Sequence, residues 1–345
     1  MEGTITSSYS GLQTVLNDNN YEDRYVYNET LNPSNVNLSP FYGYSNNSFP
    51  TGISPLIIYY YDGYYFGGNY AFRNVSGVVS TGDKSNRVKT LPTATLTKIH
   101  NSPTSVSYLR SVDYYDDKGR IIQTISNNHL GGYDVSSNDY KNTINDNIVR
   151  TKHQHSISNA TPDHTILYEY EYDHTGRLLE TYMTINNEEK VLHTAQKYND
   201  LGQVKEKYLH GYISLNKTIQ KIDYKYNIRG WLTHINNVGL SGAGDVFGME
   251  LLYDNYISTL GSSSDRQYNG NITAMKWNTQ ATGSAGGVEA YGFQYDALNR
   301  LTTANYGYSF NYYNSGNKYG VYGITYDENG NIRRLKRKSN GTLID

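Results

Sequence analysis

The sequence predicts an all-β protein made of consecutive antiparallel β-hairpins. Tyrosine occurs 38 times in 345 residues, and its ring suits the pleated, half-buried surface of a strand. Asparagine occurs 39 times and glycine 32 times, and both residues favour tight turns. A motif that joins a strand end to a turn also recurs along the last two thirds of the chain, as expected of stacked hairpin units.

The recurring motif reads Tyr-x-Tyr-Asp-x-x-Gly-Arg-Leu. Copies of it, some of them weakened, occupy residues 114–122, 170–178, 198–204, 224–232, 268–272, 293–301 and 325–332. The residues predicted to form the turns are Tyr115, Asp116, Gly119, Tyr172, Asp173, Gly176, Tyr198, Asp200, Gly202, Tyr226, Asn227, Gly230, Tyr295, Asp296, Asn299, Tyr326, Asp327 and Gly330.

Each part of the motif has a physical role in a hairpin. Tyrosines two positions apart point to one face of a strand. The Asp or Asn accepts a hydrogen bond from a backbone N–H two residues on, which starts a turn. The glycine three positions later suits a left-handed residue, and Asn299 tolerates the same conformation. Because these acids recur in every unit, we expect them to be structural rather than catalytic.

The spacing of the copies is regular with two exceptions. The second aromatic residues follow one another at intervals of 57, 26, 28, 42, 27 and 31 residues. The first interval spans about two periods, so one unit has lost its motif, and we expect it at Tyr140 to Ile148. The interval of 42 predicts an insertion from Gly239 to Ser264, a stretch rich in Gly and Ser.

The pattern resembles the RHS-repeat, or YD-repeat, family. The resemblance covers about residues 88–345. The stretches most similar to the Bacteroidota-type members of the family are residues 112–123, 226–236, 245–249 and 268–277. It implies a strip of hairpins that forms a curved or spiralling, shell-like sheet. In the family such shells enclose a C-terminal toxin or form secreted and cell-surface proteins, and some members are described as carbohydrate-binding or adhesive.

The chain departs from the full family pattern. We expect a fragment, because the core-associated segment with its Asp-Pro-x-Gly region and a toxin domain are not recognisable in the sequence. Self-proteolysis and toxicity are therefore not carried over. A signal peptide is also not recognisable, and the resemblance implies that the full-length protein is secreted or displayed on the cell surface.

Residues 1–87 do not show the motif and are predicted to form an N-terminal β cap or a divergent start of the shell. Strand candidates are Tyr21 to Tyr27 and Leu56 to Tyr65, which are rich in aromatic and β-branched residues. A cap would cover the edge of the first hairpin, as terminal units of repeat proteins do.

Composition limits the classes of function. The formal net charge of −2 argues against a general nucleic-acid binder. The absence of cysteine excludes disulfides, thiolate metal sites and cysteine nucleophiles. The longest apolar run, Leu56 to Tyr61, is too short for a membrane helix.

Several clusters could carry chemistry, and each also has a structural explanation. His153 and His155 share one strand face and could ligate a metal, but no third ligand is specified. The pairs Asp116–Asp117 and Glu188–Glu189 could suggest a glycosidase, yet adjacent residues in a turn point apart.

Two further segments could bind a ligand, but each also has a simple structural explanation. Residues 242–248 are glycine-rich, but the spacing is wrong for a dinucleotide or phosphate loop, so a flexible loop is expected. Residues 333–338 carry five positive charges and could bind an anionic surface, or form a solvated strand.

Exposed aromatic residues could bind sugars by stacking on a pyranose ring. The residues nominated for glycan contact are Tyr64, Tyr65, Phe66 and Trp277. We therefore expect a non-enzymatic scaffold segment of a shell that encloses or presents a cargo such as a toxin, without a cofactor or a metal. The alternative is a secreted or cell-surface adhesion module that binds glycans or partner proteins. Expected partners are flanking core or toxin sequence, or other copies through open sheet edges, rather than nucleic acid or membrane.

Overall fold

The computed structural model describes most of the chain as two compact units. The described residues are 2–4, 31–36, 43–44, 54–99, 107–140, 146–158, 162–212, 217–241, 244–280, 287–308 and 318–344. The units are Met1–Lys190 and Val191–Asp345, whereas the predicted division at residues 87–88 lies inside the first of them. The strand expected at residues 21–27 lies outside the described ranges.

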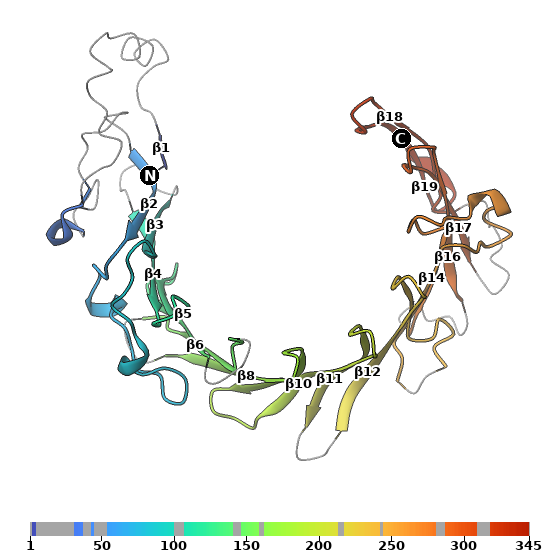
Figure 1. The fold of residues 1–345 in the computed structure, drawn as a ribbon. Helices are drawn as coiled ribbons and strands as arrows, with labels where there is room; N and C mark the ends of the chain where they lie inside the picture. Colours follow the sequence, from blue (N-terminus) through green and yellow to red (C-terminus); the bar gives the residue numbers. More distant parts are fainter. Residues whose placement is uncertain are drawn as a thin grey trace, which may run out of the picture. The chain divides into compact units, whose positions relative to one another are not determined.

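The first unit is a single antiparallel sheet in which each strand pairs with the next one along the chain (Figure 1). Its strands are β1 (Glu2–Thr4), β2 (Ser54–Tyr61), β3 (Pro92–Ile99), β4 (Ser107–Tyr115), β5 (Ile121–Asn127), β6 (Tyr133–Asp139), β7 (Arg150–His155), β8 (His164–Tyr172) and β9 (Leu178–Ile185).

The second unit repeats this arrangement. Its strands are β10 (Val191–Tyr198), β11 (Val204–Tyr212), β12 (Lys217–Tyr226), β13 (Leu232–Ile235), β14 (Phe247–Leu252), β15 (Ala274–Thr279), β16 (Glu289–Tyr295), β17 (Leu301–Tyr308), β18 (Val321–Tyr326), β19 (Ile332–Ser339) and β20 (Thr342–Ile344).

The predicted all-β fold of consecutive antiparallel hairpins is therefore confirmed. The helices in the described ranges are single 3-10 turns, such as Gly68–Tyr70 and Ser263–Asp265. Within those ranges, no helix has the length and hydrophobicity needed to cross a membrane.

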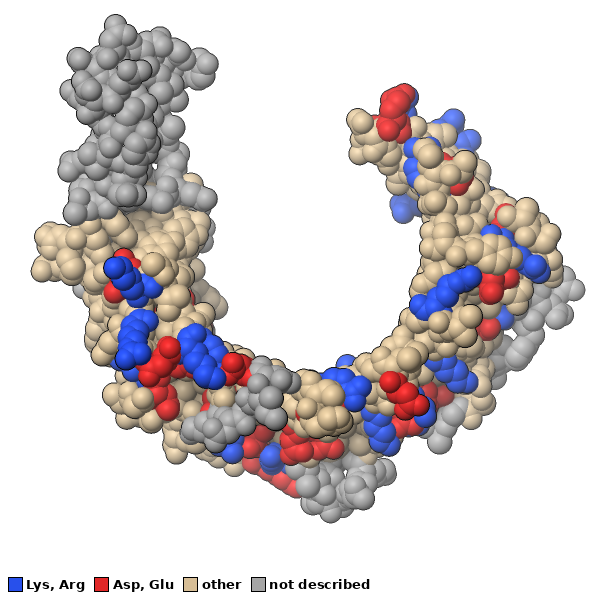
Figure 2. Space-filling model, in the orientation of Figure 1, with Lys and Arg blue, Asp and Glu red and all other residues tan. Residues whose placement is uncertain are grey.

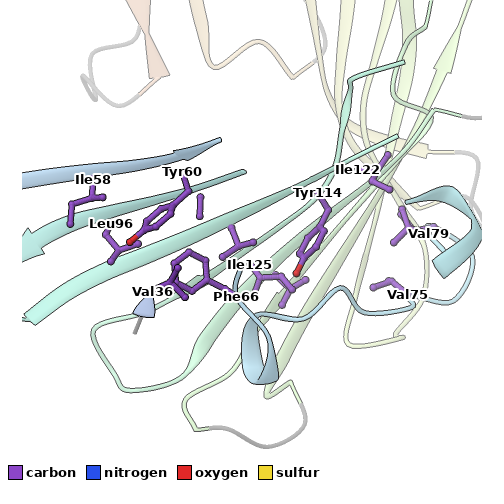
Figure 3. Packing of buried hydrophobic residues seen from close by; sticks show 14 residues of the cluster. Val36, Ile58, Tyr60, Phe66, Val75, Val79, Leu96, Tyr114, Ile122 and Ile125 are labelled. Carbon is purple, nitrogen blue, oxygen red and sulfur yellow. The ribbon is translucent and has the colours of Figure 1, made fainter. Parts of the chain in front are cut away.

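The core of the first unit lies between the sheet and the segment of residues 62–91, which connects β2 to β3. The strand predicted at residues 56–65 ends at Tyr61, because Asp62 adopts a positive φ of 69°. The segment then folds back over one sheet face, and Figure 3 shows its Phe66 and Val79 beside Ile125 and Ile122 of the sheet. A one-layer sheet needs such a cover to bury an apolar face, and here the chain supplies it from within one hairpin.

The second unit has a smaller core under another long connection, residues 253–273 between β14 and β15. Ile257 and Leu260 of this connection pack against Ala274 and Ala290. Gly292 lets the connection approach, since a Cβ there would lie 2.8 Å from the Leu260 carbonyl oxygen. The predicted insertion at residues 239–264 is displaced, because that range contains the regular strand β14.

In each unit, charged side chains outside the covered region pair with one another along and across the strands. Figure 2 shows positive and negative groups intermixed on the visible surface of each unit. In the first unit Glu169 contacts both Arg150, at 3.6 Å, and Lys190, at 2.8 Å. In the second, Lys221 lies 3.0 Å from Glu206 and 2.8 Å from Asp223.

Candidate functional site

The turn of each repeat is held by one acidic or amide side chain. In the turn between β4 and β5, Asp116 Oδ1 accepts hydrogen bonds from the backbone N–H groups of Lys118 and Arg120, both at 2.9 Å. Its Oδ2 accepts from Arg120 Nε at 2.7 Å. Gly119 completes the turn with a φ of 76°, in the left-handed region that glycine enters without a steric penalty.

The same geometry recurs at the other turns. Asp173 and Asp296 bind the backbone and guanidinium of Arg177 and Arg300 in the same way. Asn227 and Asp327 accept the corresponding backbone bonds in their turns. Gly176, Gly202, Gly230, Asn299 and Gly330 all have a positive φ, between 62° and 84°.

One predicted turn residue does not occupy its expected position. Asn199, rather than Asp200, accepts the backbone bonds of Leu201 and Gln203 at 3.0 and 2.9 Å. The spacing explains the difference, because Asn199 is three residues before Gly202 and so matches Asp116 before Gly119. Asp200 is an exposed residue within the turn.

Hydrogen bonds within the turns stabilise the carboxylates of Asp296 and Asp327 in their ionised form. The backbone N–H of Arg300, and then its guanidinium, hold the pKa of Asp296 below its ordinary value. The Asn331 side chain and backbone lower the pKa of Asp327 in the same way. A general acid needs a raised pKa, so these groups are suited to structure rather than to proton transfer.

Seven tyrosines at or near strand ends join their hairpin to the hairpin before it, whereas the hydroxyl of Tyr198 donates to Gln196 Oε1 on its own strand. Each of the seven hydroxyls donates to a backbone carbonyl 19 to 25 residues earlier, at 2.5 to 3.1 Å. We call these bonds the tyrosine ladder. The donor–acceptor pairs are Tyr115–Pro92, Tyr140–Ile121, Tyr172–Ile148, Tyr226–Val204, Tyr253–Leu232, Tyr295–Ile272 and Tyr326–Leu301.

Two ladder tyrosines, Tyr140 and Tyr253, lie outside the copies of the motif. Tyr140 stands at the predicted position of the lost unit, and its hydroxyl makes the ladder bond. Tyr253, rather than Tyr268 of the weak motif copy at residues 268–272, makes the ladder bond of its unit, and Tyr268 is 61% exposed. The spacing of 27 residues from Tyr226 to Tyr253 was the available signal.

Most of these tyrosines also coincide with a shift in strand register. The register slips between the tyrosine and the preceding residue at Tyr115, Tyr172, Tyr198, Tyr226, Tyr295 and Tyr326. An irregularity of this kind bends a strand and redirects a side chain. Five of the seven ladder tyrosines, all except Tyr140 and Tyr253, directly follow such an irregularity.

The residues nominated for glycan contact are largely used in packing. Phe66 is 4% exposed, and the Tyr64 ring lies 4.7 Å from that of Tyr114. The hydroxyl of Tyr65 donates to the Tyr61 carbonyl at 3.0 Å. Trp277, on β15, is partly exposed and stacks on Tyr291 with a ring separation of 5.6 Å.

The histidines of β7 line a hollow of about 240 Å³ on one sheet face, together with His164 and Asp134. His155 Nδ1 lies 2.5 Å from Asp134 Oδ1, and the rings of His155 and His164 are 6.5 Å apart. Among the described residues, no group of three or more His, Asp or Glu side chains is placed to hold a metal ion.

The two acidic pairs considered above lie in different surroundings. Asp116 is bound within its turn, and Asp117 accepts from Ser85 Oγ at 2.6 Å. Both line a cleft of about 700 Å³ beside residues 78–83, in which Asp146 pairs with Lys118 at 2.7 Å. Glu188 and Glu189 are exposed after β9.

Comparisons with known proteins give distant structural similarity. No protein-family model matches the sequence, and no curated protein matches it. The Tc holotoxin pore of Photorhabdus luminescens is 9% identical over 72% of this chain, with a TM-score of 0.37. The TcdB2-TccC3-Cdc42 structure is 11% identical over 72%, with a TM-score of 0.26. This chain spans 14% and 15% of those two chains.

A porin-like protein from Bacteroides uniformis ATCC 8492 is also similar. It is 11% identical over 72% of this chain and 91% of its own length, with a TM-score of 0.27. The function of the present chain therefore has to follow from its own side chains.

Proposed function

We propose that this chain is a non-enzymatic structural scaffold, a segment of an RHS/YD-repeat shell that encloses or presents a cargo such as a toxin. The proposal rests on the observation that the motif side chains make their hydrogen bonds within the chain itself. The repeated Asp, Arg and Tyr side chains bind turns and neighbouring hairpins within the chain, as Asp296, Arg300 and Tyr295 illustrate. Groups that could act on a substrate are thus engaged in holding a repeated framework.

The proposed partners follow from sheet edges and from the family resemblance. In the described part of the second unit, β20 pairs with β19 on one side and has no strand on its other side. An unpaired strand edge can accept another strand, either from flanking sequence or from a second copy. As in the family that the motif resembles, we place the full-length protein outside the cell or on its surface.

A reporter fusion tests this proposal. A small soluble enzyme with an exposed protease site is fused after Asp345, and the particle is sized by light scattering and imaged by electron microscopy. We expect a discrete hollow assembly in which the reporter resists a protease that cleaves the free reporter. A compact monomer with a reporter that is cleaved at the free rate would contradict the proposal.

The alternative, an adhesion module that recognises glycans through the nominated aromatic residues, fits the structure less well. Tyr64 and Phe66 belong to the core between residues 62–91 and the sheet, so their rings are not available to a sugar. A glycan array with the Trp277→Ala variant is the direct check. Binding that this substitution abolishes, in a chain that stays monomeric, would favour the adhesion role.

A further inference from the structure

One arginine of the first unit lies beside the core, half-buried and without a counter-charge. Val112 on β4 belongs to the core beneath residues 62–91, and Arg110, two residues earlier, points to the same face of the sheet. Its partner in register on β3 is the fully buried Leu96. Its backbone N–H donates to the side chain of Asn127 on β5 at 2.6 Å. A cation therefore stands in a row of the sheet where an apolar side chain would fit.

Two aromatic rings hold the guanidinium of Arg110. Its central carbon lies 4.2 Å from the ring centre of Phe66 and 4.9 Å from that of Tyr70. Such contacts orient the guanidinium plane but satisfy none of its five N–H donors. Among the described residues, Arg110 Nε is the buried side-chain nitrogen that lacks a hydrogen-bond partner. The two terminal nitrogens bond to no described residue either, and they remain accessible to solvent.

Within the described ranges, no acidic side chain pairs with Arg110. Three other arginines of the first unit each pair with a carboxylate, at 2.6 to 3.6 Å: Arg120 with Asp116, Arg150 with Glu169, and Arg177 with Asp173. The hydroxyl of Tyr70 does not supply a negative charge, because burial raises the pKa of this hydroxyl to about 12 and keeps it neutral near pH 7. Arg110 is thus a fixed cation whose hydrogen-bond donors are left open.

A second arginine adds positive charge to the same cluster of rings. The Tyr133 ring packs edge-on against that of Tyr70, with ring centres 5.3 Å apart. The guanidinium carbon of Arg73 lies 5.9 Å from the centre of the Tyr133 ring. One terminal nitrogen of Arg73 donates to the Asn69 carbonyl at 2.6 Å, and no acid in the described part of the chain pairs with this arginine. Two guanidinium groups therefore flank a pair of tyrosine rings without any carboxylate between them.

We propose that Arg110 is the binding site for an oxyanion, a carboxylate or a phosphate group, which its two terminal nitrogens hold as a fork. The planar guanidinium matches both kinds of group with two charge-assisted hydrogen bonds. A half-buried charge and a buried N–H without partners destabilise a fold, and a bound anion removes the first of these costs. The positive charge of Arg73 favours a doubly charged ligand, such as a phosphate monoester.

Stacking on aromatic rings does not by itself explain the position of Arg110. In the second unit, Arg229 lies over the Trp231 ring at 5.0 Å and is an exposed residue, so its donors can bind water. Arg110 makes the same kind of contact, yet its Nε is removed from water without gaining an acceptor. Arg229 is therefore a matched control, because it shares the stacking and the charge of Arg110 but has no buried donor.

The first test follows the arginine side chains of the full chain by NMR. A shielded Nε–H exchanges slowly with water and gives a signal, and the signal of Arg110 is the one that disappears in Arg110→Met. The wild type is titrated with sodium phosphate, phenyl phosphate and sodium benzoate, each at constant ionic strength. Sodium chloride at the same ionic strength is the reference, and Arg229→Met is the control variant.

We expect at least one probe to shift the Arg110 signal with saturation, at a dissociation constant of about 1 mM for two charge-assisted hydrogen bonds. Saturation by the two phosphates alone identifies a phosphate group as the ligand, and saturation by benzoate alone identifies a carboxylate. A signal that moves no further with any probe than with chloride would overturn the proposal. This measurement is made on the wild type, so it does not depend on the folding of a variant.

The second test compares variants by the rise in melting temperature that the saturating probe causes, each measured against the same variant without the probe. The wild type and Arg229→Met should be stabilised alike, because a ligand that binds only the folded state raises its stability. Arg110→Met, and Arg110→Lys, which keeps the charge but not the planar fork, should bind the probe at least about tenfold more weakly. Equal stabilisation of all four proteins would contradict a site at Arg110. The inference concerns one side chain, so it can fail while the scaffold proposal stands, and the reporter fusion tests the latter separately.

Discussion

Removal of a single hydroxyl from the tyrosine ladder should measurably weaken the fold. In Tyr295→Phe the ring remains, and the bond from Tyr295 Oη to the Ile272 carbonyl, 2.8 Å long, is lost. An intramolecular hydrogen bond contributes a net ~0.5–1.5 kcal/mol to stability. A loss of about 1 kcal/mol corresponds to a melting temperature lower by roughly 2–4 °C for a unit of this size.

The control is Tyr268→Phe. Tyr268 belongs to the same repeat pattern, but its side chain is 61% exposed and Tyr253 makes the ladder bond in its place. Both variants are unfolded in urea and by heat under identical conditions. If Tyr295→Phe destabilises the protein no more than Tyr268→Phe does, the ladder does not contribute to stability and the reasoning is wrong.

The free energy of unfolding at alkaline pH provides a second test of the Tyr295 bond. Burial raises the pKa of Tyr295 above its ordinary value near 10. A raised folded-state pKa stabilises the protein below the unfolded pKa, and this stabilisation is lost as the pH rises above about 10. The free energy of unfolding should therefore fall less steeply above this pH in Tyr295→Phe than in the wild type. Equal slopes would show that the hydroxyl is not protected in the folded state.

Three further predictions concern the turns and the core. Gly176→Ala forces alanine to a φ of 84° and should cost ~1–2 kcal/mol in urea unfolding, whereas Gly67→Ala, at a φ of −111° in open space, should change little. Phe66→Ala should cost ~3–5 kcal/mol by the same assay, against less than about 0.5 kcal/mol for Leu201→Ala, which is 79% exposed. The hydrogen bonds of the turn lower the pKa of Asp296. The ionised carboxylate therefore stabilises the folded protein above about pH 3.9, and this contribution is lost as the pH falls. Asp296→Asn should make the free energy of unfolding depend less on pH in this acid range.

The turns could be predicted from the sequence because every interaction in them is local. Asp116 binds groups two and four residues away, and the glycine between them is fixed by the required φ. The same reasoning, applied with strict spacing from Gly202, identifies Asn199. The prediction of Asp200 followed the carboxylate of the motif, whereas the amide oxygen of Asn199 also accepts backbone bonds and stands at the right spacing.

The ladder and the core could not be predicted in this way. A ladder bond joins residues 19 to 25 positions apart, and the acceptor is a backbone carbonyl that any residue type provides. The ring of tyrosine already explains its frequency in strands, so the sequence contains no separate signal for the hydrogen bond made by its hydroxyl. Phe66 lies in a glycine-rich run without strand or helix periodicity, and only the return of residues 62–91 onto the sheet buries it.

The two long connections, residues 62–91 and 253–273, leave and rejoin the sheet where the other hairpins have short turns. The flanking strands keep ordinary antiparallel pairing, with Tyr60 opposite Ala94 and Leu252 opposite Ala274. At these positions the sheet of each unit therefore accommodates a long connection while the pairing of the flanking strands is preserved. Evolution can exchange such segments independently of the hairpins, and a protein engineer can graft a foreign domain at a turn such as 296–300 with the same freedom.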